Sequence, residues 1–172
     1  MISGKNKQLY YESSIDKQLN IEVIGTKHVI DNSMREQDTF TLTETLNDGT
    51  ELKFGSCLPN QISFTGREVP IATKGMKLRV TETLEGNEGD PFEYGTYTVQ
   101  SDTPTADRTK RQITAYDAMY DIINADVKSW YDGLSFPITL KAFRDSFFAY
   151  LGTEQKETSL VNDSMTVNKT LV

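Results

Sequence analysis

The sequence predicts an α+β fold: a small, mainly antiparallel β-barrel of short strands, with two helices packed toward the C-terminal part. Short apolar–polar alternations, separated by glycine, proline and asparagine turns, fill residues 19–116, and helical periodicity begins only at residue 117. Strands in one run and helices in the next are typical of an antiparallel sheet rather than of a parallel one. We therefore expect a polar arm over 1–18, a β-barrel domain over 19–116, and a helical segment leading into a further β domain over 117–172.

The expected strands are marked by alternation and by the turns between them. Residues 20–24 and 28–31 predict a first hairpin across Gly25. A second hairpin is expected around Asn47-Asp48-Gly49. Gly66 is interpreted as the end of a short strand, and the polar run 101–109 as a long loop. The remaining strands are expected at 62–65, 76–81, 94–100 and 110–116.

Two helices are expected after the last of these strands. Asp117 is placed to cap the first helix, in which residues 118, 119, 122 and 123 are apolar. Thr139 is placed to cap the second helix and Gly152 to end it, and its apolar residues recur at spacings of three and four. These apolar residues are Leu140, Phe143, Phe147 and Leu151. The tail that follows reads as short and strand-like.

Composition limits the classes of function. The net charge is −7 with a pI of about 4.8, and the densest basic cluster is Arg108–Arg111, so direct binding of DNA or RNA is disfavoured. No stretch reaches the length of a membrane span, and the N-terminus lacks the apolar core of a signal peptide, which predicts folding in a cytoplasm. A hydrophobic share of 37% allows only a modest core, which an oligomer would complete.

The run from Ile113 to Trp130 holds the most suggestive candidates for catalysis or sugar binding. Asp117 and Asp121 are four residues apart on the first expected helix, whereas glycosidase carboxylates flank a bond from opposite sides. We interpret Asp117 as a helix cap and Asp121 as a solvated charge. The neighbouring aromatic residues could form a stacking platform for sugars, but packing at a strand–helix junction is the commoner role. They are Tyr116, Tyr120, Trp130 and Tyr131.

The other candidates point to a metal or a nucleophile. Four acidic side chains in one loop lack the spacing of a known calcium loop, and we interpret them as a solvated turn; they are Glu85, Glu88, Asp90 and Glu93. The single cysteine, Cys57, and the single histidine, His28, are too few for a structural zinc site, and a buried apolar role for Cys57 is favoured. We therefore predict no catalytic, cofactor-binding or metal-binding residues and no cofactor.

Several segments, taken in order, resemble one family. LNIEVIGTKHVIDNSMREQDTFTLTETL is followed by ELKFGSCLPNQISFTG, KGMKLRVTETL and DPFEYGTYTVQSDTPTADRTKRQITAYDAMYDI, and then by FPITLKAFRDSFFAYLG and TSLVNDSMTV. The order resembles the N-terminal hub portion of tail proteins from phages and prophages of Gram-positive bacteria, the tail-hub or tail-associated-lysin family, over residues 8–171. The most specific parts are Phe54–Cys57 and the pair formed by Gly95–Val99 with Ile113–Met119.

The resemblance implies a structural protein of the virion tail tip, assembled in a bacterial cytoplasm and without enzymatic activity. Such a hub is a homotrimeric ring of β-barrel domains, similar in fold to baseplate hubs of contractile tails. It joins the distal tail protein to a receptor-facing or cell-wall-facing part, and DNA and the tape-measure protein pass through it. The chain is then expected to be an N-terminal fragment or a split hub. The alternatives are a non-catalytic module of a tail-associated peptidoglycan hydrolase, or a carbohydrate-binding module.

Overall fold

The computed structural model describes residues 16–45, 58–86, 90–153 and 159–169. The chain divides into two compact units, Met1–Tyr120 and Asp121–Val172, each of which is described by itself. The predicted arm overlaps the described residues only at its end, where Lys17 and Gln18 belong to the first strand. The hairpin expected around Asn47-Asp48-Gly49 lies outside the described residues.

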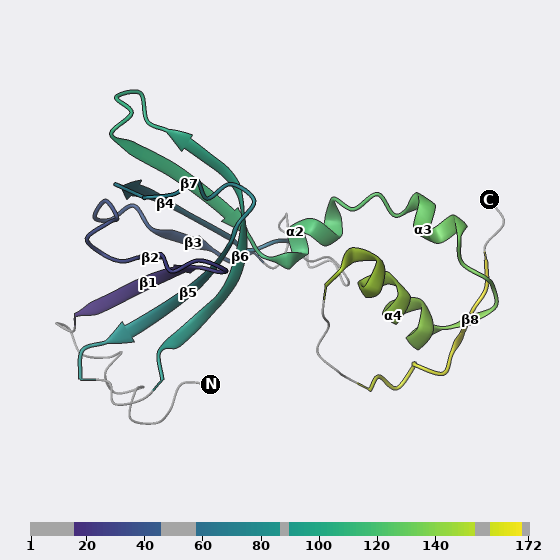
Figure 1. Ribbon diagram of the computed structural model, residues 1–172. Coiled ribbons are helices and arrows are strands. Elements are labelled where there is room, and N and C mark those ends of the chain that lie inside the picture. Colours follow the sequence, from purple (N-terminus) through teal and green to yellow (C-terminus); the bar gives the residue numbers. More distant parts are fainter. Residues whose placement is uncertain (1–15, 46–57, 87–89, 154–158, 170–172) are drawn as a thin grey trace. The chain divides into compact units, whose positions relative to one another are not determined.

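The first unit is built on an antiparallel sheet of seven strands (Figure 1). Their order across the sheet is β2-β1-β5-β6-β7-β4-β3, and every pairing is antiparallel. The strands are β1 (Lys17–Val23), β2 (Val29–Ile30), β3 (Thr41–Thr43), β4 (Gln61–Arg67), β5 (Lys77–Leu84), β6 (Phe92–Pro104) and β7 (Lys110–Tyr116). The mainly antiparallel sheet is therefore confirmed.

β6 is the longest strand and joins the two halves of the sheet. Its first part pairs with β5 and its last part with β7, and Thr98 lies opposite both Lys77 and Tyr116. The register shifts at Val80/Thr81 against β5 and at Val99/Ser101 against β7, and such irregularities bend a strand and increase its twist. The long loop predicted over 101–109 is wrong, because β6 continues as far as Pro104 on the ladder with β7.

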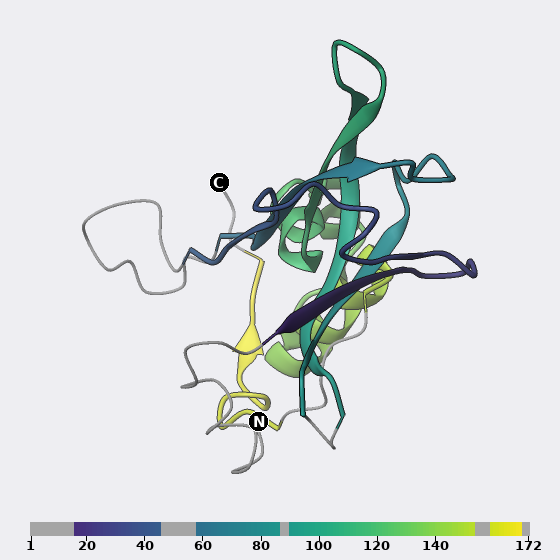
Figure 2. The same cartoon turned by 90° about the vertical axis from the view of Figure 1, so that its left-hand side faces the viewer.

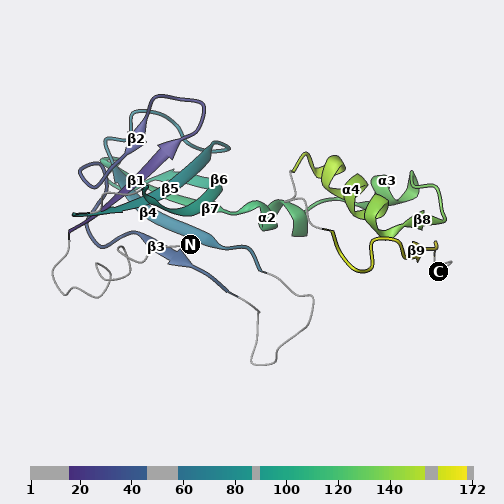
Figure 3. The same cartoon turned by 90° about the horizontal axis from the view of Figure 1, so that it is seen from below.

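The predicted closed barrel is not found, because β2 and β3 are not paired with each other among the described residues. They end the strand order at opposite margins of the sheet, as Figure 3 shows. The chain leaves β2 and crosses to the far margin, where Arg35 forms an isolated bridge with Gly66 of β4. The N–H of Glu36 donates to the carbonyl of Thr65 at 2.8 Å. Residues 31–40, which we call the crossing segment, thus link the two margins of the sheet. An opening remains beside this segment.

The core lies within the curved sheet and comes almost entirely from its strands. Alternate residues of β4, β5 and β7 are buried, which confirms the period-two pattern of the sequence. Side chains from β1 and β5 pack in one cluster with those from β4 and β7. Its fully buried members include Ile21, Val23, Ile62, Leu78, Val80, Tyr97 and Ile113.

The turn between β6 and β7 forms the tip of a long hairpin that extends beyond the neighbouring strands (Figures 1 and 2). The carboxylate of Asp107 accepts the hydroxyls of Thr105 and Thr109, and Oδ1 also accepts the N–H of Thr109 at 3.1 Å. These hydrogen bonds favour the charged form and lower the pKa of Asp107 from 3.8 to about 2, with the Thr105 hydroxyl as the largest cause.

We expect Asp107 to titrate near pH 2, and Thr109→Val to move its pKa back toward 3.8. Because the folded pKa is depressed, the stabilisation of the hairpin tip is complete above pH 3.8 and declines as the pH falls toward about 2. Carboxyl carbon chemical shifts measured by NMR across this range give the pKa directly. Thr103→Val in the same hairpin is the matched control and should leave the pKa unchanged. A wild-type pKa near 3.8 would contradict the assigned hydrogen bonds.

The second unit combines short helices with a two-stranded sheet. α2 (Ala118–Ile123) carries the chain out of the first unit, and α3 (Lys128–Asp132), β8 (Ile138–Thr139), α4 (Leu140–Leu151) and β9 (Thr166–Val167) follow. Thr139 caps α4 by accepting the N–H of Ala142 at 3.2 Å, and Gly152 ends it with a φ of 63°. Both expected helices are confirmed, whereas α3, β8 and the pairing of β8 with β9 were not predicted.

An aromatic cluster holds α3 against α4. The Trp130 ring lies 5.0 Å from Phe143 and 4.9 Å from Phe147, measured between centroids, and its indole N–H donates to Ser146 at 3.2 Å. A second link joins α4 to the tail through Arg144, whose Nη1 is 2.8 Å from Oδ1 of Asp163. None of the described residues of this unit reaches full burial.

Candidate functional site

Two aspartates in the run from Ile113 to Trp130 accept backbone N–H groups. Oδ1 of Asp117 accepts the N–H of Met119 at 3.0 Å, and the N–H of Asp117 donates to the carbonyl of Asn60 at 3.0 Å. Oδ1 of Asp126 accepts the N–H of the first residue of α3 at 3.1 Å. Asp121 is exposed, as predicted. The capping role expected for Asp117 is confirmed.

The aromatic residues of the same run pack in two separate groups. Tyr116 and Tyr120 stack on each other at 4.6 Å between ring centroids, with 22° between the planes, so each covers one face of the other. Trp130 and Tyr131 belong to the second unit, in which Trp130 packs against the aromatic side chains of α4. Within each unit, these contacts agree with the packing role expected for the aromatic residues.

The residues considered for metal binding form no cluster in the part of the chain that the structure describes, where no three His, Cys, Asp or Glu side chains could hold an ion together. Glu93 lies 3.8 Å from the guanidinium of Arg79. His28 lies in the turn between β1 and β2, where its carbonyl accepts the N–H of Val23. Glu88 and Cys57 lie outside the described residues.

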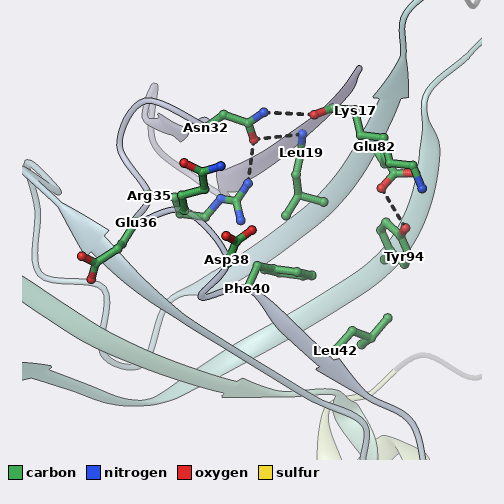
Figure 4. A pocket seen from close by; sticks show the side chains of 11 residues that line it. Lys17, Leu19, Asn32, Arg35, Glu36, Asp38, Phe40, Leu42, Glu82 and Tyr94 are labelled. Carbon is green, nitrogen blue, oxygen red and sulfur yellow. Dashed lines mark hydrogen bonds between the residues drawn. The ribbon is translucent and has the colours of Figure 1, made fainter. Parts of the chain in front are cut away.

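A cavity of about 700 Å³ lies in the first unit at the opening of the sheet (Figure 4). β1, β5 and β6 supply part of its wall, and the crossing segment with β3 supplies the rest. This volume falls within the range of small-ligand sites, about 300–1,000 Å³. The lining residues are Lys17, Leu19, Asn32, Arg35, Glu36, Gln37, Asp38, Phe40, Leu42, Glu82 and Tyr94.

A polar clasp of Asn32 and Arg35 spans one end of this cavity. The Asn32 side chain takes the place of a neighbouring strand beside β1: its Oδ1 accepts the N–H of Leu19 at 3.3 Å and its Nδ2 donates to the carbonyl of Lys17 at 3.0 Å. Oδ1 also accepts Nη2 of Arg35 at 2.6 Å. Because the backbone of Arg35 bridges to β4, the clasp connects β1 with the other margin of the sheet.

Arg35 is a half-buried cation in this clasp. Its guanidinium carbon lies 5.5 Å from the centroid of the Phe40 ring, an arrangement that favours a cation over an aromatic face. Burial lowers the pKa of Arg35, and the nearby charge of Asp31 opposes this effect only in part. Nε is buried and has no hydrogen-bond partner among the described residues.

Glu82 places a carboxylate on the opposite wall. It is only 7% exposed, and its Oε2 accepts the hydroxyl of Tyr94 at 3.0 Å. Its position on β5 has the same parity as the buried Leu78, Val80 and Leu84, so the strand turns this side chain inward. A buried carboxylate is costly unless it is hydrogen-bonded, and the phenol provides one such bond.

Glu36 also borders the cavity, but Figure 4 shows its carboxylate directed away from the other lining side chains. It forms ion pairs with Lys110 of β7 and, at 3.4 Å, with Arg67 of β4. The hydrogen bond from Lys110 is the main reason that the pKa of Glu36 is lowered, and the Arg67 guanidinium adds to it. This side chain therefore ties the crossing segment to the sheet.

Comparison with protein-family models, with curated proteins and with solved structures gives no significant match for this chain. Within the described ranges, no helix has the length and apolarity needed to cross a membrane.

The cavity was not predicted from the sequence, because its lining comes from several separate segments. Only one signal was present: an acidic residue, Glu82, at a buried position in an otherwise regular alternation with Leu78, Val80 and Leu84. Asn32 and Arg35 lie in a polar stretch of the sequence. No local sequence pattern indicates that this stretch crosses the opening of the sheet.

Proposed function

We propose that this chain is a structural component of a phage or prophage tail tip, a hub subunit that acts in a homotrimeric ring. The homotrimeric ring is inferred from the resemblance to tail-hub proteins, which rests on several sequence segments that occur in the same order along the chain. The ring would join the distal tail protein to the part of the tail that faces the cell and would let DNA and the tape-measure protein pass. The antiparallel architecture of the first unit is compatible with this role.

The main structural support is the exposed apolar surface of the second unit. Its aromatic cluster is only half-buried, and the segment after α4 exposes Leu160 at 46%, Val161 at 99% and Met165 at 58%. Exposed apolar side chains that gather in one segment mark interaction surfaces more often than isolated ones do. In a symmetric ring, the neighbouring subunit would cover such a surface.

The charge of the chain supports passage of DNA rather than its binding. A net charge of −7 repels phosphate groups, and non-specific binding of DNA depends on neutralising those groups with Lys and Arg. A ring made of such subunits would hold DNA only weakly, as a conduit requires.

The test is self-association of the 172-residue chain, measured by sedimentation equilibrium over a range of concentrations. We expect an average mass that rises from 19.4 kDa toward three times that value, and Val161→Asp should shift the equilibrium toward the monomer. Val29→Asp is the matched control, since Val29 is an exposed valine (44%) on β2 of the first unit. A monomer at every concentration, or equal effects of the two substitutions, would count against the proposal.

A further inference from the structure

Arg35 differs from the other half-buried arginines of the chain. Arg111 has its Nε 2.7 Å from a carboxylate oxygen of Asp102, and Arg144 has its Nη1 2.8 Å from one of Asp163. Among the described residues Arg35 forms no ion pair, and its Nη2 donates to the neutral side chain of Asn32. A guanidinium forms its strongest hydrogen bonds with carboxylate and phosphate groups, so an anionic acceptor brought by a ligand into the cavity would bind favourably to Arg35.

The surroundings of Arg35 indicate what else such a ligand carries. The guanidinium is stacked over Phe40, and the apolar side chains of Leu19 and Leu42 complete this side of the cavity (Figure 4). A cavity of about 700 Å³, whose wall combines these apolar side chains with several charged and amide side chains, accommodates a small organic molecule rather than a bare ion. The ligand therefore needs an apolar or ring-shaped frame next to its anionic group.

The carboxylates of the cavity limit the charge of the ligand. Glu82 is almost fully buried on one wall, whereas Asp38 and the cation Lys17 line the same cavity at exposed positions. A second negative charge on the ligand, placed beside the buried Glu82, would be repelled by its carboxylate. Hydroxyl or ammonium groups, in contrast, could donate hydrogen bonds to these carboxylates. Phosphate esters and dicarboxylates are disfavoured on this ground, whereas a monocarboxylate with donors fits.

We propose that the cavity between β1 and β3 binds a small organic monocarboxylate that carries hydroxyl or ammonium donors on an apolar frame, with Arg35 holding the carboxylate. Acidic sugars and amino acids share this chemistry. The site is independent of subunit assembly, and the proposal stands whether or not the chain is a tail hub.

The experiment is a titration of the full chain, followed by ¹H–¹⁵N NMR, with glucuronate and leucine as carboxylate probes. Glucose and leucine methyl ester are their counterparts without the carboxylate. We expect saturable shifts of the backbone N–H signals of Leu19, Arg35 and Tyr94 with at least one carboxylate and none with its counterpart. Glucuronate binding alone identifies an acidic sugar as the preferred ligand, and leucine binding alone identifies an amino acid; either supports the proposal.

Substitutions then test the assigned roles. Arg35→Gln should weaken binding by about tenfold or more, since a hydrogen bond to a charged group contributes at least that factor. Arg79→Gln removes an exposed arginine, with ion pairs to Glu22 and Glu93, and should leave binding unchanged. Glu82→Gln should improve binding of the dicarboxylate glutarate relative to wild type, which tests the charge limit without altering Arg35.

The proposal is overturned if neither carboxylate causes saturable shifts in the folded protein. It is also overturned if a carboxylate and its neutral counterpart bind equally well, or if binding is the same in wild type and in an Arg35→Gln variant whose NMR spectrum remains that of the folded chain. If Arg35→Gln does not fold, Arg35→Lys takes its place, and the same loss is expected because lysine lacks the planar donors.

Discussion

Replacing Asp102 with alanine should lower the free energy of unfolding of the first unit by about 3–5 kcal/mol, the cost of breaking a buried ion pair. The Asp102 side chain is fully buried, and its Oδ2 accepts both the N–H and the hydroxyl of Thr73 at 2.7 Å. Its Oδ1 lies 2.7 Å from Nε of Arg111 as an ion pair, without the geometry of a directed hydrogen bond. Removing it leaves the fully buried Thr73 without its acceptor and Arg111 without its counter-charge.

Urea unfolding followed by circular dichroism measures this loss. Asp102→Asn should be milder, because an amide oxygen can still accept from Thr73 while the charge is lost. The matched control is Glu22→Ala, which removes a 3.2 Å ion pair with Arg79 in which both side chains are about half exposed. That change should cost only about 0–1 kcal/mol, the usual range for a surface pair. Similar losses for Asp102→Ala and Glu22→Ala would show that the Asp102 network does not stabilise the sheet.

The elements that the sequence predicts well are those with purely local causes. Alternating burial along β5 and β7 follows from the pleat of a strand, and it is visible in the chain because one face meets the core. The ends of α4 follow from Thr139, which accepts a backbone N–H, and from Gly152, which takes a positive φ of 63°. Each signal lies within a few residues of the structure that it specifies.

The elements that were missed depend on distant partners. The end of β6 is polar, and it is a strand because Ser101 to Pro104 pair with β7, not because their side chains are buried. Closure of the barrel was predicted from the number of short strands, whereas it depends on how the outermost strands meet. Here β2 has only two residues, and the chain after it crosses to β4 instead of extending the sheet.

The candidate site shows the same division. Asp117 was correctly interpreted as a cap, because capping involves neighbouring residues. The cavity depends on Leu19, Asn32, Arg35 and Tyr94, which only the folding of the sheet brings together. Glu82 was the exception that the sequence could have revealed, since a carboxylate at a buried position of a strand needs a specific partner.

Gly66 was interpreted from the sequence as the end of a strand, but it lies inside β4 and is paired with Arg111 on β7. Its requirement for glycine is steric: a Cβ at this position would lie 2.4 Å from Cγ2 of Val69, a side chain in the core. Valine is short and stiff, so it cannot move aside without shifting the backbone. Gly66→Ala should therefore destabilise the first unit by about 1–3 kcal/mol, the usual cost of overpacking.

The cause can be separated from general damage by a double-mutant cycle, measured by urea unfolding. Val69→Ala removes the clashing methyl groups, so Gly66→Ala should cost at least about 1 kcal/mol less in that background than in wild type, a coupling expected only for residues in contact. Gly75→Ala is the matched control: Gly75 has a φ of +79° and no atom within 4 Å of a built Cβ, so its cost comes from backbone strain alone. That cost should be the same with or without Val69→Ala. Strict additivity of Gly66→Ala with Val69→Ala would show that the glycine is required for the backbone of β4 and its bridge to Arg35, and not for the space beside Val69.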